Sequence, residues 1–469
     1  MSTAPKLIIY SPINMKTIFI TVQLGAEIKN WFLGDFYKLC KENPEVKLVV
    51  FTHAETLEKY RQQFWHERCT FEILPDLKLG QRKAKMYFRI LSFASLPTSA
   101  ALFRLKYFYL NGGSYLMFFA KRLIWLLGHT RIWRSLIRLT EFYFFRDEGA
   151  WREYFERYQP DVVFAPTTYR DADVTMIKYA KRHGVPAVGM LRGWDNMSSK
   201  AFLTAHPDIL LVQNPTMVEE AVNWNDVARE RVKIIGFPYF DHYVDPSWQM
   251  SREEVAKAIG VDPSKKWIGY FVGGLFVGFL RAGDGEWHAR LLDKIAGSGE
   301  LGNVHVVASI HPGDRGDKVK WDDKKIGDHI QVMRLAKGWN FTGDMMKIIM
   351  NFVRECAVTV DFGSSLSLEA AIFDRPLIFI GFNGPEGQNV AWHKRISVAY
   401  RYYTHVKYLV DAGGVWEVAD EKELVRALKT YLQDPSLHRE GRKRIVERLV
   451  GPLDGKAGKR AFETIMSLM

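Results

Sequence analysis

Short apolar runs that lack the alternation of a half-exposed strand recur along the first half of the chain. The earliest, KTIFITV, runs from Lys16 to Val22, passes a turn at Gly25 and leads into a helical pattern from Ile28 to Cys40. Later runs of the same kind lie at Lys47 to Phe51, Asp161 to Ala165, Ala187 to Met190 and Asp208 to Val212. Apolar strands that alternate with helices predict a parallel, doubly wound sheet.

The same pattern returns in the second half, after a segment that breaks regular structure. That segment, IIGFPYFDHYVDP from Ile234 to Pro246, carries one glycine and two prolines. Strands are predicted beyond it at Trp267 to Val272, Val304 to Ile310, Val358 to Val360 and Leu377 to Ile380. We therefore expect an α/β protein with two Rossmann-like, doubly wound domains that face each other across a cleft, residues 1–240 and 241–454. A terminal helix, residues 455–469, is expected to cross back to the first domain.

The segment from Val358 to Phe382 carries the clearest chemical signal. Its strand ends at Asp361, Gly363 allows a tight turn, and Ser364 and Ser365 can cap the next helix while its first N–H groups stay free for a phosphate. Glu369 follows one turn along on the face of Ser365. An ordinary capped helix would have the same residues, but the carboxyl end of a parallel strand is where open α/β sheets bind ligands.

Composition narrows the class of protein. The chain has 469 residues, 47% of them apolar and 25% charged, which is enough for two or three domains with real cores. Its three cysteines form no CxxC pair, so neither a disulfide framework nor a thiolate metal site is expected, and a reducing cytosol fits. No window reaches the roughly 18 uninterrupted apolar residues that a spanning helix needs. We expect a cytoplasmic protein.

The charge points to an anionic partner, since the net charge is +12 and the pI about 9.3. Lys and Arg alternate with aromatic and aliphatic residues through residues 81–145. On one helix there, two stripes are predicted, with Arg131, Arg134 and Arg138 on one and Ile132, Leu136 and Leu139 on the other. A helix in a membrane interface has this pattern, and so does a buried helix with snorkelling arginines. No RNP or zinc-finger motif is present, so we expect an anionic membrane surface and no nucleic acid as partner.

Several short motifs resemble those of the GT-B nucleotide-sugar glycosyltransferases. The resemblance is to the branch with surface-polysaccharide transferases, teichoic-acid polymerases and UDP-N-acetylglucosamine 2-epimerases. The motifs are the Gly25 turn, GWDNMSSK (Gly193 to Lys200), IIGFPYFD (Ile234 to Asp241), the His311-Pro312 pair, DFGSSLSLEAAIFDRPLI (Asp361 to Ile378) and LDGKAGKRAFETI (Leu453 to Ile465).

By this resemblance the second domain holds the nucleotide of the donor. Gly363, Ser364 and Ser365 would receive phosphate oxygens, and Glu369 would take the ribose hydroxyls. His311, with Pro312, would donate to the departing phosphate and so lower the cost of its developing charge. The resemblance implies two further phosphate contacts, at Gly274 and Arg281.

The first domain would then bind the acceptor and supply a base for its hydroxyl proton. Two carboxylates are candidates for that base, Asp195 in the loop after Met190 and Glu27 at the Gly25 turn. Trp194 could stack on a sugar face. Three further residues are implied as acceptor contacts, namely Gly25, Asn196 and Lys200.

The chain lacks the E-x7-E pair of retaining enzymes and a DxD metal motif. The resemblance thus implies an inverting transfer with no metal and no cofactor, from a UDP-, CMP-, CDP- or GDP-linked sugar to a lipid-linked or surface-polysaccharide acceptor. The enzyme would act as a peripheral protein on the inner face of the cell membrane. Three alternatives stay open: a CDP-glycerol-type glycerophosphotransferase, a UDP-GlcNAc 2-epimerase-like enzyme, whose acidic set and histidine do not align here, and a non-catalytic nucleotide-binding module.

Overall fold

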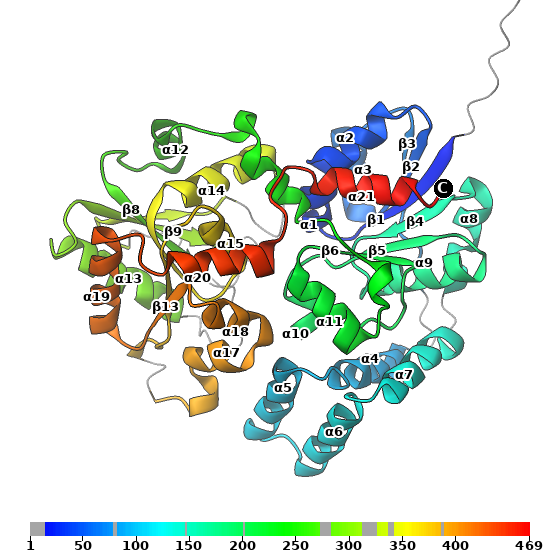
Figure 1. Cartoon of the computed structure of the whole chain (residues 1–469), viewed down its shortest axis with the longest axis horizontal. Helices are drawn as coiled ribbons and strands as arrows, with labels where there is room; N and C mark the ends of the chain where they lie inside the picture. Colours follow the sequence, from blue (N-terminus) through cyan, green and yellow to red (C-terminus); the bar gives the residue numbers. More distant parts are fainter. Residues whose placement is uncertain are drawn as a thin grey trace, which may run out of the picture.

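Two parallel sheets, each flanked by helices, form the two halves of the molecule (Figure 1). The computed structural model describes residues 15–77, 82–145, 148–199, 202–272, 283–311, 326–335, 342–385 and 389–469. The predicted α/β class with two doubly wound domains is confirmed. The predicted boundary at residues 240 and 241 falls within the 3-10 helix η4 (Pro238–Val244), between the last strand of one sheet and the first of the other.

The first sheet has seven strands in the order β3-β2-β1-β4-β5-β6-β7. Each described pairing within it is parallel, and Lys16 of β1 lies opposite Val46 of β2. The strands are β1 (Lys16–Val22), β2 (Val46–Thr52), β3 (Cys69–Ile73), β4 (Val162–Ala165), β5 (Ala187–Met190), β6 (Ile209–Val212) and β7 (Val232–Ile234). Helices cover both faces, so β1 is buried from Thr17 to Val22, which explains its unbroken apolar run.

The second sheet has six strands in the order β10-β9-β8-β11-β12-β13, again with parallel pairing throughout the part described. The strands are β8 (Lys266–Val272), β9 (Val304–Ile310), β10 (Ile330–Met333), β11 (Cys356–Asp361), β12 (Leu377–Ile380) and β13 (Val415–Val418). In both sheets the chain starts near the middle and winds outward in both directions. All strand ends of one polarity therefore meet at one edge, where ligands bind in such folds.

The helices complete the layers. Those of the first half are α1 (Gly25–Glu27), the π-helix η1 (Ile28–Phe32), α2 (Asp35–Glu42), α3 (Ala54–Gln63), α4 (Arg82–Ala94), α5 (Ser99–Leu110), α6 (Tyr115–Leu127), α7 (Arg131–Phe144), α8 (Arg152–Tyr158), α9 (Asp171–Arg182), α10 (Asn196–Ser199) and α11 (Pro215–Asn225). Those of the second half are α12 (Arg252–Ile259), α13 (Asp284–Gly297), α14 (Gly343–Glu355), α15 (Ser365–Ile372), α17 (Ile396–Tyr402), α18 (Thr404–Asp411), α19 (Glu421–Gln433), α20 (Arg439–Ile445), η8 (Val446–Val450) and α21 (Ala457–Met466).

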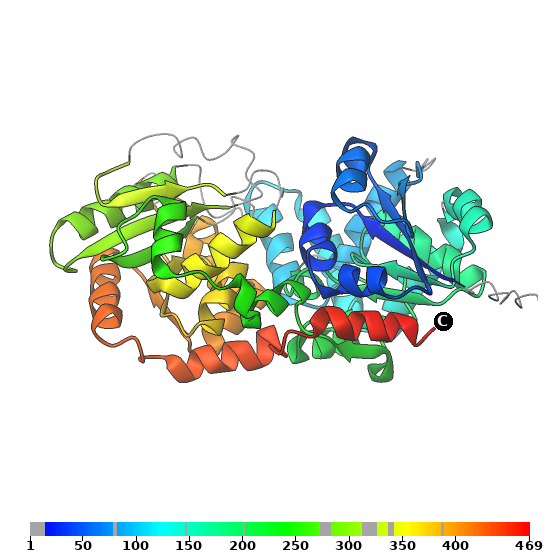
Figure 2. The same ribbon diagram turned by 90° about the horizontal axis from the view of Figure 1, so that it is seen from above.

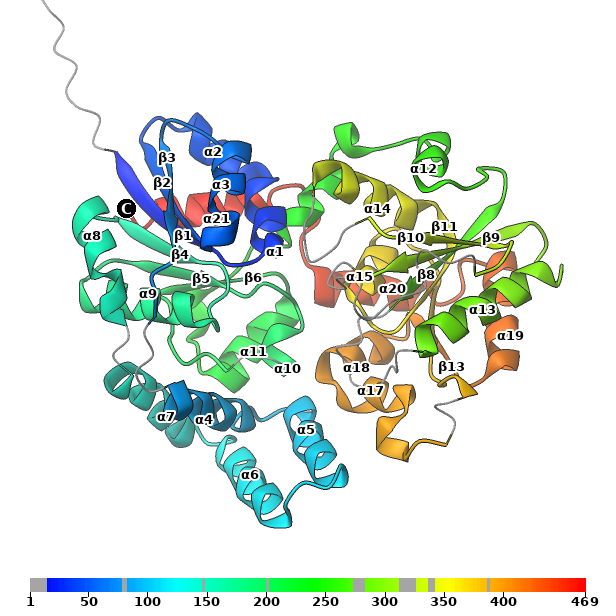
Figure 3. The ribbon, with the colours of Figure 1, turned by 180° about the vertical axis from the view of Figure 1, so that it is seen from behind.

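Helices α4 to α7 form an insertion between β3 and β4, which we call the helical insertion, and Figure 3 shows it beside the first sheet. A small core of its own includes Phe88 and Ile137. Its helix α5 also reaches the second half of the molecule. There the rings of Phe103 and Tyr402 stack with centroids 4.9 Å apart, and Ser99 Oγ lies 3.0 Å from Thr404 Oγ1. The insertion therefore touches both halves.

Two of the three arginines in the stripe of α7, Arg134 and Arg138, point inward, which corrects their interpretation as membrane contacts, whereas Arg131 is 79% exposed. Arg134 binds the carboxylate of Asp226 with two hydrogen bonds, 2.8 and 2.6 Å long, and Arg138 adds a third at 2.8 Å. Burial alone would raise the pKa of Asp226, but the bonds and charges of these arginines outweigh it and lower the pKa to about 2. The opposite stripe is the exposed one, made of Ile132, Leu136 and Leu139.

The chain ends with α21, which leaves the second half and packs on the first (Figure 2). Asp241 fixes its start, because its carboxylate accepts hydrogen bonds of 3.0 and 2.8 Å from the backbone N–H groups of Ala457 and Gly458. Ala461 and Ile465 are fully buried in the core of the first half. The terminal helix thus completes a hydrophobic core that begins some 440 residues earlier in the chain.

The helix predicted from Ile28 to Cys40 is broken in the structure. A π-helix occupies its first part, since Leu33 N–H bonds to Ile28 O, and α2 starts afresh after Gly34. Within the described part of the chain, no helix combines the length and apolar character needed to cross a bilayer.

Candidate functional site

The turn after β11 places two serines at the start of α15. Gly363 has a φ of +83°, and a Cβ there would lie 2.7 Å from Val406 Cγ1, so both backbone and space require glycine. Ser364 caps α15 by accepting a hydrogen bond from Leu366 N–H. The Ser364 hydroxyl in turn donates to buried Asp361, at 2.9 Å. Ser364 therefore builds the turn, and its hydroxyl is already engaged.

Ser365 has a different environment. It is the first residue of α15, its side chain is exposed, and neither its hydroxyl nor its backbone N–H bonds to another described residue. The N-terminal end of a helix favours an anion because its first N–H groups point outward. Of the two predicted serines, Ser365 is therefore the one placed to meet a phosphate.

His311 follows the last residue of β9 and lies at the same edge of the sheet as Ser365. Strand β8 alone separates β9 from β11 in the sheet order. Since all three strands are parallel, the residues after their carboxyl ends share one edge. His311 and Ser365, both predicted to contact the donor phosphate, therefore lie at the same edge of the second sheet. Four other predicted residues, Pro312, Gly274, Arg281 and Lys200, lie outside the described residues.

Glu369 is held by two tyrosines of the segment that joins the halves. Its two carboxylate oxygens each accept a 2.5 Å hydrogen bond, one from Tyr239 and one from Tyr243. The ammonium of Lys29, from η1, lies 3.3 Å above the centre of the Tyr239 ring. Burial lowers the pKa of Lys29 to about 8, although the charge of Glu369 acts to raise it. Glu369 thus belongs to a cluster that links both halves, and its assignment to the ribose stays a prediction.

The loop after β5 carries Asp195 to the junction with α18. Asn196 is buried, and its side-chain amide donates to Asp195 Oδ1 at 3.0 Å. Its side-chain oxygen Oδ1 accepts a hydrogen bond from Gly193 N–H. The ring of Trp194 lies edge-on to His405, with centroids 5.4 Å apart. Three predicted residues therefore come together, although Trp194 is largely buried against the second half instead of open to a sugar.

A second carboxylate, Glu220 of α11, lies close to Asp195. Its side chain is 2% exposed, and its surroundings include Ser198 and Tyr408. Burial raises the pKa of Glu220 well above its ordinary value, and the charge of Asp195 adds to this effect. The two carboxylates thus differ in burial, since Glu220 is enclosed and Asp195 is half-buried.

Glu27 lies in a different, closed polar cluster at the ends of β1 and β4. It is 1% exposed, and its oxygens accept bonds from Leu24 N–H at 2.6 Å and Thr167 Oγ1 at 2.7 Å. Asp173 in the same cluster accepts bonds from Thr21 and Gln23. Burial raises the pKa of Asp173 to about 8. Gly25 begins α1 beside this cluster. These contacts favour a structural role for Glu27 over that of the base.

Sequence reasoning missed several residues of these clusters. Tyr239 and Tyr243 lie in the segment that was predicted to break regular structure, so no helical spacing could assign them a shared face, and the structure has the 3-10 helix η4 there. His405 and Glu220 lie far from each other and from the loop Gly193 to Ser199 in the chain. Only the packing of α10 and α11 against α18 brings them together.

Comparison with known proteins supports the fold. No protein-family model and no curated protein matches the chain. Among solved structures, the S. aureus MnaA–UDP co-structure matches with a TM-score of 0.53 at 12% identity, over 97% of this chain and 98% of the other. A UDP-GlcNAc 2-epimerase from Neisseria meningitidis bound to UDP-GlcNAc gives 0.53 at 11%, over 97% and 100%. The glycotransferase of kitacinnamycin gives 0.51 at 12%, over 97% and 99%. The resemblance to the GT-B fold is confirmed at the level of architecture.

Proposed function

We propose, starting from the GT-B fold of this chain, that the protein is an inverting, metal-independent glycosyltransferase. It moves a sugar from a nucleotide-linked donor to a lipid-linked or surface-polysaccharide acceptor at the inner face of the cell membrane. The fold supports an enzyme of this kind, since its structural neighbours include a UDP-GlcNAc 2-epimerase bound to UDP-GlcNAc and a glycotransferase. The observation that carries the proposal is the anion-ready turn at Ser365, at the same sheet edge as His311.

The donor phosphates bind at the start of α15. Ser365 supplies an exposed hydroxyl and a backbone N–H group, and the helix end adds a favourable field for negative charge. His311 donates a hydrogen bond to the phosphate that leaves. Because charge develops on that phosphate as the C1–O bond breaks, a donor held in place beforehand lowers the barrier.

Asp195 serves as the base on the acceptor side. The acceptor oxygen forms the new bond to C1 as the bond from C1 to the phosphate oxygen breaks, and Asp195 takes the hydroxyl proton. Its half-buried carboxylate at the junction of the two halves supports this role.

Helix α6 supports attachment to a membrane. Its sequence, YLMFFAKRLIWLL, is largely apolar, and not one of its residues is buried by the rest of the described chain. One side of α6 packs on the insertion, where Trp125 donates to Thr98 O, and the other side is exposed. An apolar helix with an exposed side favours insertion into the interface of a bilayer. Exposed large apolar side chains also gather on the other helices of the insertion: Met86, Tyr87, Ile90, Phe108, Tyr109, Ile132, Leu136, Leu139, Tyr143 and Phe144.

The charge of the helical insertion selects an anionic surface. Residues 82–145 contain eleven Lys and Arg and one acid, Glu141. Five of these cations are already paired with Glu141, Asp171 or Asp226, namely Lys85, Arg89, Arg131, Arg134 and Arg138, so the attraction to a surface comes from the other six. Lys121 and Arg122 lie within α6 itself, next to its apolar residues. Cations near anionic lipid headgroups contribute about 1 kcal/mol each. The proposed surface is therefore a bilayer that contains anionic lipid.

A panel of nucleotides and nucleotide sugars tests the donor part of the proposal. UDP, GDP, CDP and CMP and their sugar conjugates are added singly, and the melting temperature of the full chain is recorded. A bound ligand at 100 times its dissociation constant adds about 2.7 kcal/mol of stability, which is easily measured. Stabilisation by one nucleotide class is expected. If none of them stabilises the folded protein, the proposal is wrong.

A UDP-GlcNAc 2-epimerase-like activity is the second candidate. Two structural neighbours support it, because UDP-GlcNAc 2-epimerases from Neisseria meningitidis and Methanocaldococcus jannaschii share the fold. The gathering of Asp195, Glu220 and His405 at the junction of the halves also supplies acids and a histidine. The two activities differ in their need for an acceptor. Conversion of UDP-GlcNAc to its C2 epimer without acceptor, followed by NMR, would favour the epimerase.

A further inference from the structure

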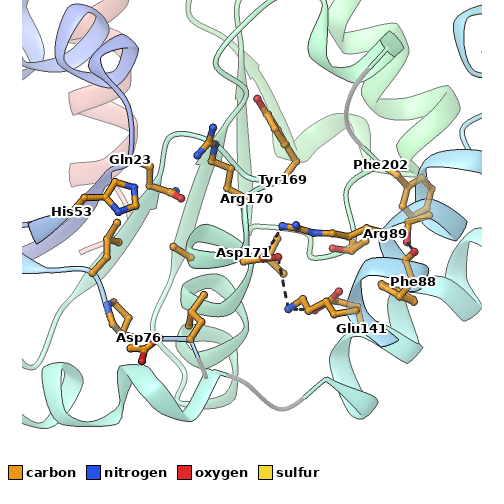
Figure 4. A pocket seen from close by; sticks show the side chains of 18 of the residues that line it. Gln23, His53, Asp76, Phe88, Arg89, Glu141, Tyr169, Arg170, Asp171 and Phe202 are labelled. Atoms are coloured by element: carbon orange, nitrogen blue, oxygen red, sulfur yellow. Dashed lines mark hydrogen bonds and ion pairs between the residues drawn. The ribbon is translucent and has the colours of Figure 1, made fainter. Parts of the chain in front are cut away.

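A cavity of about 1050 Å³ lies within the first half of the molecule, between its sheet and the helical insertion (Figure 4). Its floor comes from the loops that follow four adjacent strands, with Gln23 after β1, His53 after β2, Asp76 after β3 and Tyr169 after β4. Its opposite wall comes from α4 and α7. None of the residues assigned above to donor, base or acceptor lines this cavity.

We propose that this cavity binds the saccharide portion of the acceptor, an inference that rests on the proposed transferase function and names its substrate class. The cavity is placed for that role. Tyr169 and Arg170 follow β4, and Asp195 follows β5, its direct neighbour in the sheet. Residues after adjacent parallel strands share an edge, so a chain of sugars in the cavity would extend toward the proposed base.

The charges that line the cavity do not favour an anionic ligand. Lys85 lies 3.7 Å from Glu141 and 3.8 Å from Asp171, and Arg89 lies 2.6 Å from Asp171. Figure 4 shows the contacts to Asp171. Cations that are already paired with carboxylates add little attraction for a phosphate.

The cavity also has polar side chains that are not paired with one another, and these suit a ligand with hydroxyl groups. Glu55 and Asp76 line the cavity, both are exposed, and their carboxylates bond to no other side chain among the described residues. Carboxylates accept short, strong bonds from hydroxyl groups. Arg170 likewise has no side-chain bond within the described chain and can donate to ring or hydroxyl oxygens. A neutral molecule with many hydroxyl groups satisfies both kinds of group.

An aromatic ring completes the set. Tyr169, Phe88 and Phe202 line the cavity, but the two phenylalanines are buried in the small core of the insertion, so half-buried Tyr169, labelled in Figure 4, is the ring left for a ligand. The face of an aromatic ring is electron-rich and attracts the polarised C–H groups of a sugar ring. The volume lies at the top of the range of about 300–1000 Å³ that holds drug-sized ligands, so it has room for several sugar rings.

Helix α4 separates the cavity from the exposed apolar side of the insertion. Lys85 and Phe88 are buried and line the cavity, whereas Met86, Tyr87 and Ile90 are exposed. One helix thus adjoins both the proposed glycan site and the proposed bilayer contact. A glycan attached to a membrane lipid would meet both surfaces at once.

An array of defined oligosaccharides, built from hexose, N-acetylhexosamine and uronic acid units, tests the inference with the full chain. Wild-type protein is expected to bind at least one glycan. Tyr169→Ala, and separately Glu55→Gln with Asp76→Asn, should each weaken that binding about tenfold or more. Trp65→Ala is the control, because this exposed aromatic residue lies outside both the cavity and the helical insertion, and it should bind normally. Melting temperatures show that each variant is folded.

The nucleotide panel keeps this test separate from that of the proposed function. If a nucleotide stabilises the protein but no glycan binds, or if glycan binding survives both cavity variants, the cavity inference is overturned and the transferase proposal stands. If glycans bind at the cavity but no nucleotide stabilises the protein, the transferase proposal is wrong and the cavity still binds saccharides. The source of the glycan follows from one more comparison: tighter binding to the same glycan on a lipid in vesicles than in solution identifies a lipid-linked acceptor.

Discussion

Tyr239 donates a 2.5 Å hydrogen bond to Glu369, across the junction between the two halves of the molecule. Tyr243 makes the same bond to the other oxygen of that carboxylate. A buried carboxylate with two phenol donors is costly to leave unpaired, because its charge then lacks solvation as well as partners. These two hydroxyls therefore hold α15, and with it the proposed phosphate turn, against the segment that joins the halves.

Removal of both hydroxyls should destabilise the protein measurably. Tyr239→Phe with Tyr243→Phe is expected to lower the free energy of unfolding by about 3 kcal/mol or more, measured with urea, since bonds to charged groups contribute about 1.5–3 kcal/mol each. Tyr179→Phe is the control, because the hydroxyl of that buried tyrosine bonds to no other described residue. Equal losses in the two proteins would show that the Glu369 bonds do not matter for stability.

The two serines of the turn should respond differently to substitution. Ser365→Val is expected to weaken nucleotide binding by about 1.5 kcal/mol, roughly tenfold, at an unchanged melting temperature, because only its hydroxyl is open to a ligand. Ser364→Ala removes a helix cap and should instead lower stability by about 1 kcal/mol. Calorimetric titration and thermal unfolding of both variants make the comparison. If folded Ser365→Val binds nucleotide with normal affinity, the assignment of the phosphate site to this turn is wrong.

Turnover should separate the two candidate bases. His311→Ala and Asp195→Asn are each expected to reduce transfer about 10²-fold, since acid–base groups contribute about 10²–10⁴-fold. Glu27→Gln should leave turnover within a few-fold and lower the melting temperature, because its carboxylate is buried with two partners. A large loss of turnover in stable Glu27→Gln, together with normal Asp195→Asn, would reverse the assignment.

Membrane binding should depend on apolar residues of α6 more than on the arginines of α7. Leu116→Glu with Leu123→Glu is expected to abolish flotation with vesicles that contain anionic lipid, since a fully buried leucine contributes about 1.5–3 kcal/mol. Trp65→Glu changes an equally exposed apolar residue outside the insertion and should float like wild type. Wild-type protein that stays behind when the vesicles float, at low salt, would contradict the membrane proposal.

Asp226 should make the docking of α7 sensitive to acid. Its pKa is lowered to about 2, so the stability it contributes is present above about pH 4, its unfolded value, and is lost as the pH falls through 2. Asp226→Asn leaves two buried arginines without their partner and should cost about 3–5 kcal/mol at pH 7. Glu153→Gln breaks an exposed ion pair and serves as control, at less than about 1 kcal/mol. Urea unfolding at pH 7 and pH 3 measures both effects.

Sequence patterns predicted the strands well because burial on both faces leaves a clear apolar run. The segments Ala187–Met190, Val304–Ile310 and Leu377–Ile380 appear as strands at the predicted residues. Edge strands were harder. β3, β10 and β13 lie at sheet edges with partly exposed side chains, so their sequences lack that signal.

The chemistry of the site followed a similar division. The turn at Gly363 to Ser365 was predictable because its signal is local, a glycine and a cap at fixed spacing. The orientation of α7 was not predictable. The helix is amphipathic, with an arginine stripe and an apolar stripe, and only Asp226, some ninety residues away, decides which stripe faces inward. Likewise His53 and Tyr169 each follow a strand, but nothing local shows that α4 closes a cavity over them.

The terminal helix α21 has a consequence for the order of folding during synthesis. Ala461 and Ile465 lie in the same core as residues of β1, yet they are made after the whole second half. The first half therefore leaves the ribosome with part of its core open and cannot close it until α21 has been made. In domains that fold as independent units, the first half is finished before the second appears. Here the second half is made while the first half is still incomplete, and the first half exposes apolar surface during that time.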